Sequence, residues 1–435
     1  MRFARILLTT IFILSSNLLF AQEFPETIKP LLQTKWGQKM PYNILCPKLT
    51  SGGESKRMKA GCVPVAMAQI IKYYRYPAIS PDKKYHYLWD KMTNTADAAM
   101  DREKLVAIGK LISDCGVVAR TNYGIDQSGS FARDAVSSLK YLFNYSKYMR
   151  MIHRDSLKTP EEQAQLLSTI FEELKAGRPI ICSGKLGVDS KGKDERHMFV
   201  IDGCKGKRVH VNFGWEGYED GYYSLDDLGG YALNQTFIVG VSPDYKPTVT
   251  EIKLSTAGTL AQQISGKEEH LKITGALNAS DFDALKKLRR NLISIDLKDA
   301  QVEEIPDTAF GKFKNLVTVV LPSRVKKIGR MSFAGCVQLS NVEFPQQLEQ
   351  IGNAAFAGCL GLVDIQLPSS IRKISSYAFT LNASLIYVTL PEGLTSLGDK
   401  AFYGCIHLFR LTLPKSLTKV GEDITGKCPK LNKKS

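Results

Sequence analysis

Two residues of the sequence, Cys62 and His197, have side chains that together could cleave an amide bond. Cys62 directly precedes the apolar run of "AGCVPVAMAQIIKYYRYP", which favours a buried helix with Pro64 tolerated in its first turn. The amino terminus of a helix offers unpaired backbone NH groups and the positive end of the dipole, which would lower the thiol pKa and favour a thiolate. His197 follows much later in the chain and could protonate the leaving amine.

Three further residues could complete such a site. Attack on an amide carbonyl places negative charge on oxygen, and Gln38 in "TKWGQKMPYN" could donate to this oxygen together with the backbone NH of Cys62. Asn212 in "VNFGW" could accept from the imidazole and fix its orientation, and Trp215 follows in the same segment. Each of these residues could instead have a purely structural role. A lone cysteine before a helix is usually structural, and Trp215 could simply pack in the hydrophobic core. Their ordered combination favours catalysis.

The motifs around these residues resemble those of streptopain-type cysteine peptidases. The resemblance rests on "WGQKMPYN", "GCVPVAMAQIIKYYRYP" and "HMFVIDGCKGKRVHVNFGWEGYEDGYYSLDDL", and it covers residues 25–243. It implies a papain-like α+β fold in which a helical subdomain carries the cysteine and a β-rich subdomain carries the histidine. It further implies Cys62 as nucleophile, His197 as general acid and base, and Gln38 as oxyanion donor, with Asn212 and Trp215 orienting and shielding the histidine.

The resemblance also implies a substrate-binding region and shows two departures. "QSGS" is similar to the family's substrate-lining loop, and we expect substrate binding by Ser128, Gly129, Ser130 and Arg196. Where the family commonly has "NWGWGG", this chain reads "NFGWEG", so Phe213 cannot donate an indole hydrogen bond and the support of the histidine is expected to differ. The second departure is a missing prosegment, because the peptidase motifs begin soon after the expected signal, which leaves control of premature activity unexplained.

The second half of the sequence is organised by a 23-residue repeat. Three sets of equivalent positions, here called columns, recur at this interval. They are Phe310, Phe333, Phe356, Phe379 and Phe402; Pro322, Pro345, Pro368, Pro391 and Pro414; and Ile328, Ile351, Ile374, Leu397 and Val420. One such unit cannot bury its apolar face alone, so the pattern predicts a solenoid of stacked strands and turns. The units, with "AFAGC" and "LPSSIRKI", resemble BspA-type leucine-rich repeats over residues 291–425, and the preceding segment is similar to an amino-terminal cap.

The nine cysteines do not indicate a metal site or a disulfide scaffold. The count is odd, and the sequence contains no CxxC pair. Cys336, Cys359 and Cys405 share one column of the repeat, whose remaining member is Asn382. This pattern favours a ladder of buried small residues over metal ligation, and we expect neither metal nor organic cofactor.

The amino-terminal sequence "MRFARILLTTIFILSSNLLFAQEF" indicates a secretory signal, residues 1–21, because its apolar run is short and interrupted by threonines and serines. Its removal would lower the formal charge from +15 to +13. The basic residues are scattered and no aromatic-interleaved basic stripe is present, so nucleic-acid binding is not expected. No later segment has spanning length, and we expect an exported protein that is secreted, periplasmic or held at the cell surface.

Together these patterns predict an α+β, papain-like two-subdomain cysteine peptidase followed by a leucine-rich-repeat solenoid. The expected domains are a signal peptide at 1–21, a peptidase domain at 22–243, a linker and cap at 244–290 and a repeat domain at 291–435. The predicted function is endopeptidase cleavage of proteins or peptides through a Cys62–His197 thiolate–imidazolium pair and a thioester. The repeats would bind a protein or cell-surface ligand. The alternative is a catalytically degenerate adhesin that binds through its repeats.

Overall fold

The computed structural model describes the chain except for residues 1–26, 52, 189–193 and 433–435. The expected signal peptide therefore lies outside the described residues. The chain forms two compact units: the first runs to Ser138 and resumes over Met151–Val241, and the second comprises Leu139–Arg150 and the residues from Ser242 onward. The domain limits derived from the sequence stay predictions, and they do not anticipate that residues 139–150 join the second unit.

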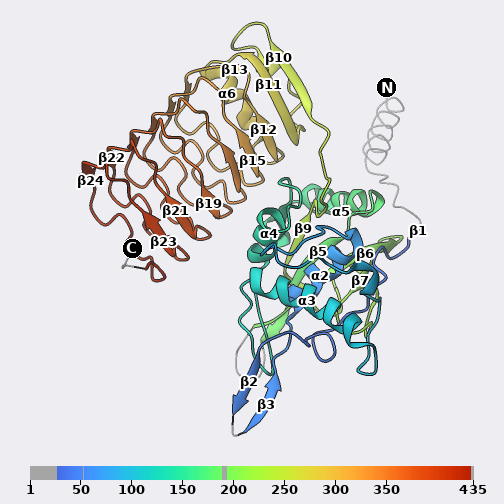
Figure 1. Ribbon diagram of the computed structural model, residues 1–435. Coiled ribbons are helices and arrows are strands. Elements are labelled where there is room, and N and C mark those ends of the chain that lie inside the picture. Colours follow the sequence, from blue (N-terminus) through green and yellow to red (C-terminus); the bar gives the residue numbers. More distant parts are fainter. Residues whose placement is uncertain (1–26, 52, 189–193, 433–435) are drawn as a thin grey trace, which may run out of the picture. The chain divides into compact units, whose positions relative to one another are not determined.

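The first unit is built on a seven-stranded sheet (Figure 1). Its strands lie in the order β4-β9-β5-β6-β7-β8, with β1 beside β6, and β5 pairs antiparallel with both β6 and β9. Their bounds are β1 Thr27–Ile28, β4 Arg150–His153, β5 Ile180–Val188, β6 Asp194–Lys205, β7 Arg208–Asn212, β8 Gly221–Tyr223 and β9 Leu233–Val239. Of the expected site residues, His197 lies on β6 and Asn212 ends β7.

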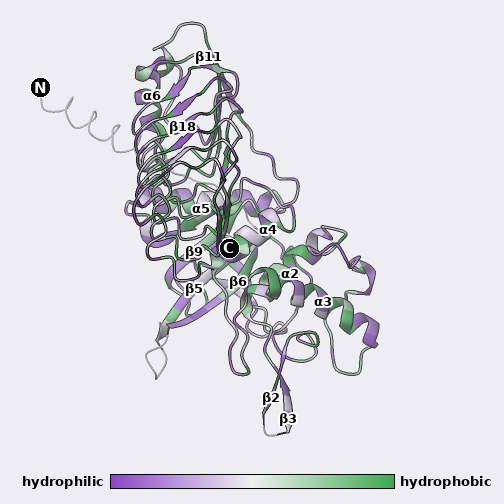
Figure 2. Ribbon diagram, turned by 60° about the vertical axis from the view of Figure 1, so that its left-hand side comes forward, coloured by the Kyte–Doolittle hydropathy of each residue, from purple (hydrophilic) through white to green (hydrophobic). Residues whose placement is uncertain are grey.

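Helices and short elements accompany this sheet. The longer ones are α2 Cys62–Tyr74, α3 Arg102–Val118, α4 Ala132–Tyr141 and α5 Pro160–Lys175; the short elements are the 3-10 turns Trp89–Lys91 and Arg154–Ser156 and the hairpin of β2 Lys48–Ser51 with β3 Glu54–Arg57. Helix α2 packs against α3 and β6. Every residue from Val63 to Ile71 is buried, which explains why α2 is apolar on nearly every side (Figure 2).

The second unit is a solenoid of parallel strands. It begins with β10 Thr250–Leu254, β11 His270–Ala276 and α6 Ala279–Leu285, whose apolar side chains share one core with the repeats, and a 3-10 turn at Leu260–Gln262 and another at Lys286–Leu288 flank α6. The repeat strands follow: β12 Ser294–Asp296, β13 Ala300–Gln301, β14 Glu304–Ile305, β15 Thr318–Val320, β16 Lys327–Ile328, β17 Asn341–Glu343, β18 Gln350–Ile351, β19 Asp364–Ile365, β20 Lys373–Ile374, β21 Tyr387–Thr389, β22 Ser396–Leu397, β23 Arg410–Thr412 and β24 Lys419–Val420. From β14 and β15 onward, paired strands lie one 23-residue unit apart, as in Ile328 with Ile351.

The phenylalanine column forms a stack through the solenoid core. Phe310, Phe333, Phe356, Phe379 and Phe402 are fully buried, and their neighbouring ring centroids lie 5.0 to 5.4 Å apart with interplanar angles of 4° to 9°. Offset stacking of aromatic rings adds to the free energy of area burial. The predicted solenoid is confirmed, and each unit completes the core of the next.

Each repeat also contains a turn residue in the left-handed region that is not glycine. Thr308, Met331, Ala354, Tyr377, Lys400 and Asp423 occupy the same position in successive repeats, with φ between 50° and 59°. This conformation costs a non-glycine residue about 1 kcal/mol. The backbone NH of Met331 donates to the Asn353 carbonyl in the next repeat, and the NH of Tyr377 donates to that of Asp399, so contact between repeats offsets the cost.

The cysteine column forms a ladder of buried residues, as the sequence predicts, and the structure adds hydrogen bonds between the units. The Sγ atoms of Cys336, Cys359 and Cys405 donate to phenylalanine carbonyls of the preceding unit at 2.9 to 3.2 Å, and Cys428 continues the column. Asn382 interrupts it. Its side chain is fully buried, and neither its amide nitrogen nor its amide oxygen has a hydrogen-bonding partner among the described residues.

We expect Asn382→Cys to raise the free energy of unfolding of the second unit by about 1 kcal/mol, because it removes a buried unpaired amide and restores the ladder. All three tryptophans, Trp36, Trp89 and Trp215, lie in the first unit. The urea midpoint of the second unit, followed by circular dichroism, should therefore rise. The midpoint of the first unit, followed by tryptophan fluorescence, should stay the same. The converse substitution Cys359→Asn should destabilise the second unit. A lower midpoint for Asn382→Cys at an unchanged m-value would contradict this account.

Candidate active site

Cys62 is the first residue of helix α2, and it is held there by a turn that requires glycine. Gly61 caps the helix with φ of 92°, and a Cβ at this position would lie 3.2 Å from the Ser128 carbonyl oxygen. The backbone NH groups of Met198, Val63 and Cys62 itself favour the ionised thiol electrostatically. Burial raises the pKa of Cys62 and is the largest effect, whereas these NH groups lower it. Cys62 as a whole residue is partly exposed.

His197 lies next to Met198 on β6, and its ring orientation is set by a main-chain carbonyl. The side chain is only 6% exposed, and Nε2 lies 2.7 Å from the Phe213 carbonyl oxygen. Because a carbonyl can only accept, Nε2 carries the hydrogen and Nδ1 is the unprotonated nitrogen. Burial lowers the pKa of His197 to about 4, although the bond to Phe213 acts in the opposite direction. The folded protein therefore favours a neutral imidazole.

Aromatic rings surround the imidazole. The Trp215 ring stacks on His197 with centroids 4.6 Å apart, and the buried Phe213 ring stacks on Trp215 at 5.0 Å. Phe213 thus replaces the family's expected tryptophan as a packing residue. Its main-chain carbonyl supplies the support of the imidazole, so this support does not depend on an indole hydrogen bond.

The expected hydrogen bond between Asn212 and the imidazole is not formed. The Asn212 side chain instead accepts from Gln69 Nε2 at 2.9 Å and from the Gly214 NH at 3.0 Å, and it donates to the Thr34 carbonyl at 2.8 Å. Asn212 pairs with Val200 across the sheet, and cross-strand partners share a face. Val200 and His197 are three residues apart on one strand, so they point to opposite faces. Asn212 faces α2, away from the ring.

The other expected residues lie at different places around Cys62. The Gln38 carbonyl accepts from the Ala60 NH at 2.9 Å, which holds Gln38 beside the turn that precedes Cys62. Ser128 is buried, and its hydroxyl donates to the Lys59 carbonyl at 2.7 Å, so it supports that turn. A Cβ at Gly129 would meet no atom within 4 Å, which leaves this position open for a ligand.

Ser130 and Arg196 are engaged elsewhere. The Ser130 hydroxyl lies 2.7 Å from that of Thr121. Arg196 is exposed and bonds to Asp194, and as the neighbour of His197 on β6 it points to the opposite face of the sheet. The substrate-binding roles of both residues stay predictions.

Tyr231 is a site residue that the sequence did not reveal. Its ring centroid lies 5.5 Å from that of His197, and the charge of the Cys62 thiolate adds to burial in raising the pKa of Tyr231. The sequence places it in "LGGYAL", between strands, where no motif pointed to catalysis. Only the tertiary structure brings this loop to the Cys62–His197 pair.

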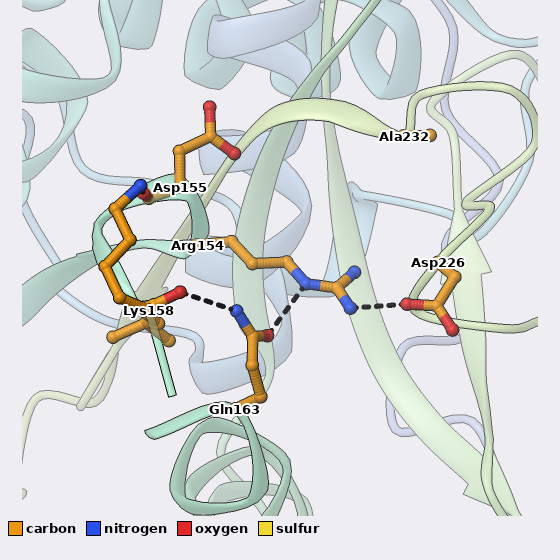
Figure 3. Close-up of a pocket in the computed structure, with 7 residues that line it drawn as sticks. Arg154, Asp155, Lys158, Gln163, Asp226 and Ala232 are labelled. Atoms are coloured by element: carbon orange, nitrogen blue, oxygen red, sulfur yellow. Dashed lines mark hydrogen bonds and ion pairs between the residues drawn. The ribbon is translucent and has the colours of Figure 1, made fainter. Parts of the chain in front are cut away.

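Arg154 holds the loop that carries Tyr231, and Figure 3 shows its ion pair with Asp226 of that loop. Its guanidinium donates to the Leu225 carbonyl at 2.6 Å and to Gln235 Oε1 at 2.9 Å, and it forms an ion pair with Asp226. Gln235 Nε2 donates in turn to the Leu225 and Tyr231 carbonyls. A polar pocket of about 550 Å³ lies beside this network, and neither Cys62 nor His197 lines it.

Among the residues described, no group of three or more histidine, cysteine, aspartate or glutamate side chains is arranged to hold a metal ion. Over the same residues, no helix is both long and apolar enough to cross a membrane. The absence of a cofactor stays a prediction.

The fold and this site define a papain-like cysteine peptidase unit joined to a leucine-rich-repeat solenoid, which confirms the predicted fold class. Residues 36–223 match the model of the Peptidase C10 family, and residues 303–432 match six copies of the BspA type leucine rich repeat region. The chain is 31% identical to the active wild-type interpain A cysteine protease of Prevotella intermedia over 97% of that chain and 51% of this one, with a TM-score of 0.45. Residues 36–223 thus form a Peptidase C10 domain, and residues 303–432 form a BspA-type repeat region.

Curated relatives agree with this assignment. The chain is 29% identical over 260 residues to streptopain of Streptococcus pyogenes, which covers 50% of this chain and 63% of streptopain. It is 28% identical over 260 residues to the thiol protease/hemagglutinin PrtT of Porphyromonas gingivalis, covering 51% of this chain and 28% of that protein. This chain therefore spans less than two thirds of the length of these relatives.

The lowered pKa of His197 predicts a pH dependence of stability. Between pH 6.5 and about 4 the unfolded histidine binds a proton that the folded one does not, so stability is lost as pH falls through this window. The full effect is about 3 kcal/mol. Urea unfolding of the first unit, followed by tryptophan fluorescence at pH 7 and pH 4.5, should show most of this loss.

The matched variant is His197→Gln, which cannot titrate in this range and should show a smaller decrease between the same two pH values. His270 in the second unit, whose pKa burial also lowers to about 4, provides a control. His270→Gln should leave the pH dependence of the fluorescence transition unchanged. Equal pH dependence in the wild type and in His197→Gln would refute the assignment.

Proposed function

We propose that this chain is an exported endopeptidase in which Cys62 attacks the peptide carbonyl and His197 moves the proton. The observation that carries the proposal is the convergence at Cys62. The backbone NH of Met198, the neighbour of His197 on β6, favours the Cys62 thiolate together with the NH groups of Val63 and Cys62, and the imidazole is fixed with its Nδ1 unprotonated. Membership of a cysteine peptidase family supports the same reaction.

The pKa directions modify the resting state that the sequence predicts. Burial raises the pKa of Cys62 and lowers that of His197, so each charge alone is disfavoured. We infer a resting pair of neutral thiol and neutral imidazole, in which the thiolate and the imidazolium form together as the substrate arrives. The three NH groups stabilise the sulfur anion, and the Phe213 carbonyl stabilises the imidazolium.

The reaction then follows from the positions of the groups. The proton moves from Sγ to Nδ1 as sulfur attacks the carbonyl carbon, and the oxyanion accepts from the Gln38 amide and the Cys62 NH. Nδ1 returns the proton to the amine as the C–N bond breaks, which leaves a thioester on Cys62. Nδ1 then takes a proton from water, the hydroxide attacks the thioester, and the acid leaves as the thiol is restored.

The repeat unit is proposed to bind a protein or cell-surface ligand. The described repeat strands form parallel ladders, of which β14-β16-β18-β20-β22-β24 is unbroken, and such arrays present extended surfaces for partners. Export is proposed from the amino-terminal sequence, and the substrates are proposed to be proteins or peptides.

Labelling by an epoxide-type inhibitor of thiol proteases tests the enzyme. The wild type should be labelled at Cys62 and should cleave unfolded protein under reducing conditions, and Cys62→Ala should lose both. Gln38→Ala should lower kcat about 10²- to 10³-fold by removing an oxyanion donor, while labelling of Cys62 is retained. A wild type that neither labels nor cleaves would favour the alternative, a binding protein with a degenerate peptidase unit.

The pH dependence of hydrolysis gives an independent prediction. Because the pKa of His197 is lowered to about 4, protonation of Nδ1 should abolish activity only near that pH. We expect the acidic limb of the kcat/KM profile near pH 4. A limb at 6.5 or above would show that the imidazole is not buried as described.

A further inference from the structure

Gln69 is a buried amide on the same helix as the nucleophile. It lies seven residues after Cys62, two turns along α2 and on the same face. Its side chain is 1% exposed, and burial of a primary amide is unfavourable unless its donors and acceptor are paired. The residues around it show what it pairs with.

The Gln69 amide joins three segments of the chain. Its Oε1 accepts from the Trp36 NH at 3.2 Å, two residues before Gln38. Its Nε2 donates to Asn212 Oδ1 at 2.9 Å, and Asn212 Nδ2 lies 3.4 Å from Gln69 Oε1, so the two amides face each other. One side chain thus links the helix of the nucleophile, the segment of the oxyanion donor and the end of β7.

Asn212 transmits this link to the group that holds the imidazole. Asn212 Oδ1 also accepts from the Gly214 NH, so one amide oxygen fixes the chain on both sides of Phe213. Gly214 has φ of 70°, and a Cβ there would lie 3.0 Å from the Val65 side chain of α2. Asp220 Oδ1 accepts from the Phe213 NH at 2.9 Å. The direction of the Phe213 carbonyl, and with it the ring of His197, is therefore set from α2.

We propose that Gln69 is a positioning residue for the Cys62–His197 pair, acting through Asn212 and the Phe213 carbonyl. It touches neither the thiol nor the imidazole. Its function is to keep the distance and angle between α2 and the turn at residues 212–214 constant while the proton moves between Sγ and Nδ1. The inference rests on the proposed peptidase reaction.

Gln69→Met removes the hydrogen bonds at nearly constant volume. We expect kcat to fall about 10- to 100-fold with KM within about twofold, because small displacements of reacting groups reduce rate more than binding. The rate of epoxide labelling at Cys62, read by mass spectrometry of the labelled peptide, should fall in parallel. Tyr87→Phe is the matched control: it removes a buried hydrogen bond to Asp114 in the same unit, and it should leave kcat unchanged.

Gln69→Glu provides a conservative rescue that depends on pH. Burial should raise the pKa of the new carboxyl group, and its protonated form can donate to Asn212 and accept from the Trp36 NH as glutamine does. At pH 5 the kcat of Gln69→Glu should lie within about threefold of the wild-type kcat. Above pH 8 it should fall toward the kcat of Gln69→Met, because ionisation removes the donor.

The possible outcomes separate this proposal from the proposed function. A wild type without labelling or hydrolysis refutes the peptidase reaction itself. An active wild type with Gln69→Met equal to Tyr87→Phe refutes the positioning role, as does a Gln69→Glu kcat that stays constant relative to wild type from pH 5 to 8. If Gln69→Met does not fold, the pH dependence of the Gln69→Glu kcat relative to wild type tests the positioning role by itself. If neither variant folds, Gln69 is a core residue only and the proposal fails.

Discussion

The candidate active site depends on the burial of one imidazole, which favours its uncharged form. His197 is removed from water on a strand of the central sheet, and the Phe213 carbonyl is its hydrogen-bonding partner. Burial makes the imidazole a weaker base, but it also strengthens the electrostatic interaction between the imidazole and each dipole that faces it. In the proposed mechanism the thiol and the imidazole are both neutral at rest, and the proton moves between them as Cys62 attacks the substrate carbonyl. The surrounding elements hold these two groups rigidly.

This constraint explains the distribution of polar groups behind the site. The amides of Gln69 and Asn212 and the carboxylate of Asp220 all bond to the backbone or to each other around residues 212–214. They lie where a loose turn would let the imidazole rotate. The aromatic rings of Trp215 and Tyr231 cover the opposite side, so the proton acceptor is enclosed by rigid groups.

The sequence predicts those parts of the molecule whose signals are local or periodic. Cys62 is recognisable because a helix begins there, and the repeat columns specify the solenoid because every unit repeats the same contacts. The partner of the imidazole was not predictable, because it is a main-chain carbonyl that any residue can provide. Asn212 was given the wrong partner, since its face follows from the register with Val200, which only the folded sheet defines. Gln69 and Tyr231 likewise need tertiary structure to be seen.

The left-handed turn residues of the repeats have a consequence for how such a chain can vary. The turns from Thr308 to Lys400 are each stabilised by a carbonyl of the following unit, so a relation between equivalent positions of neighbouring repeats is maintained along the array. Duplication or loss of one whole unit leaves that relation intact at every junction. Loss of a single residue breaks it for the unit concerned and shifts the phenylalanine stack. The length of the array can therefore change by whole repeats, while the core of the peptidase unit stays unchanged.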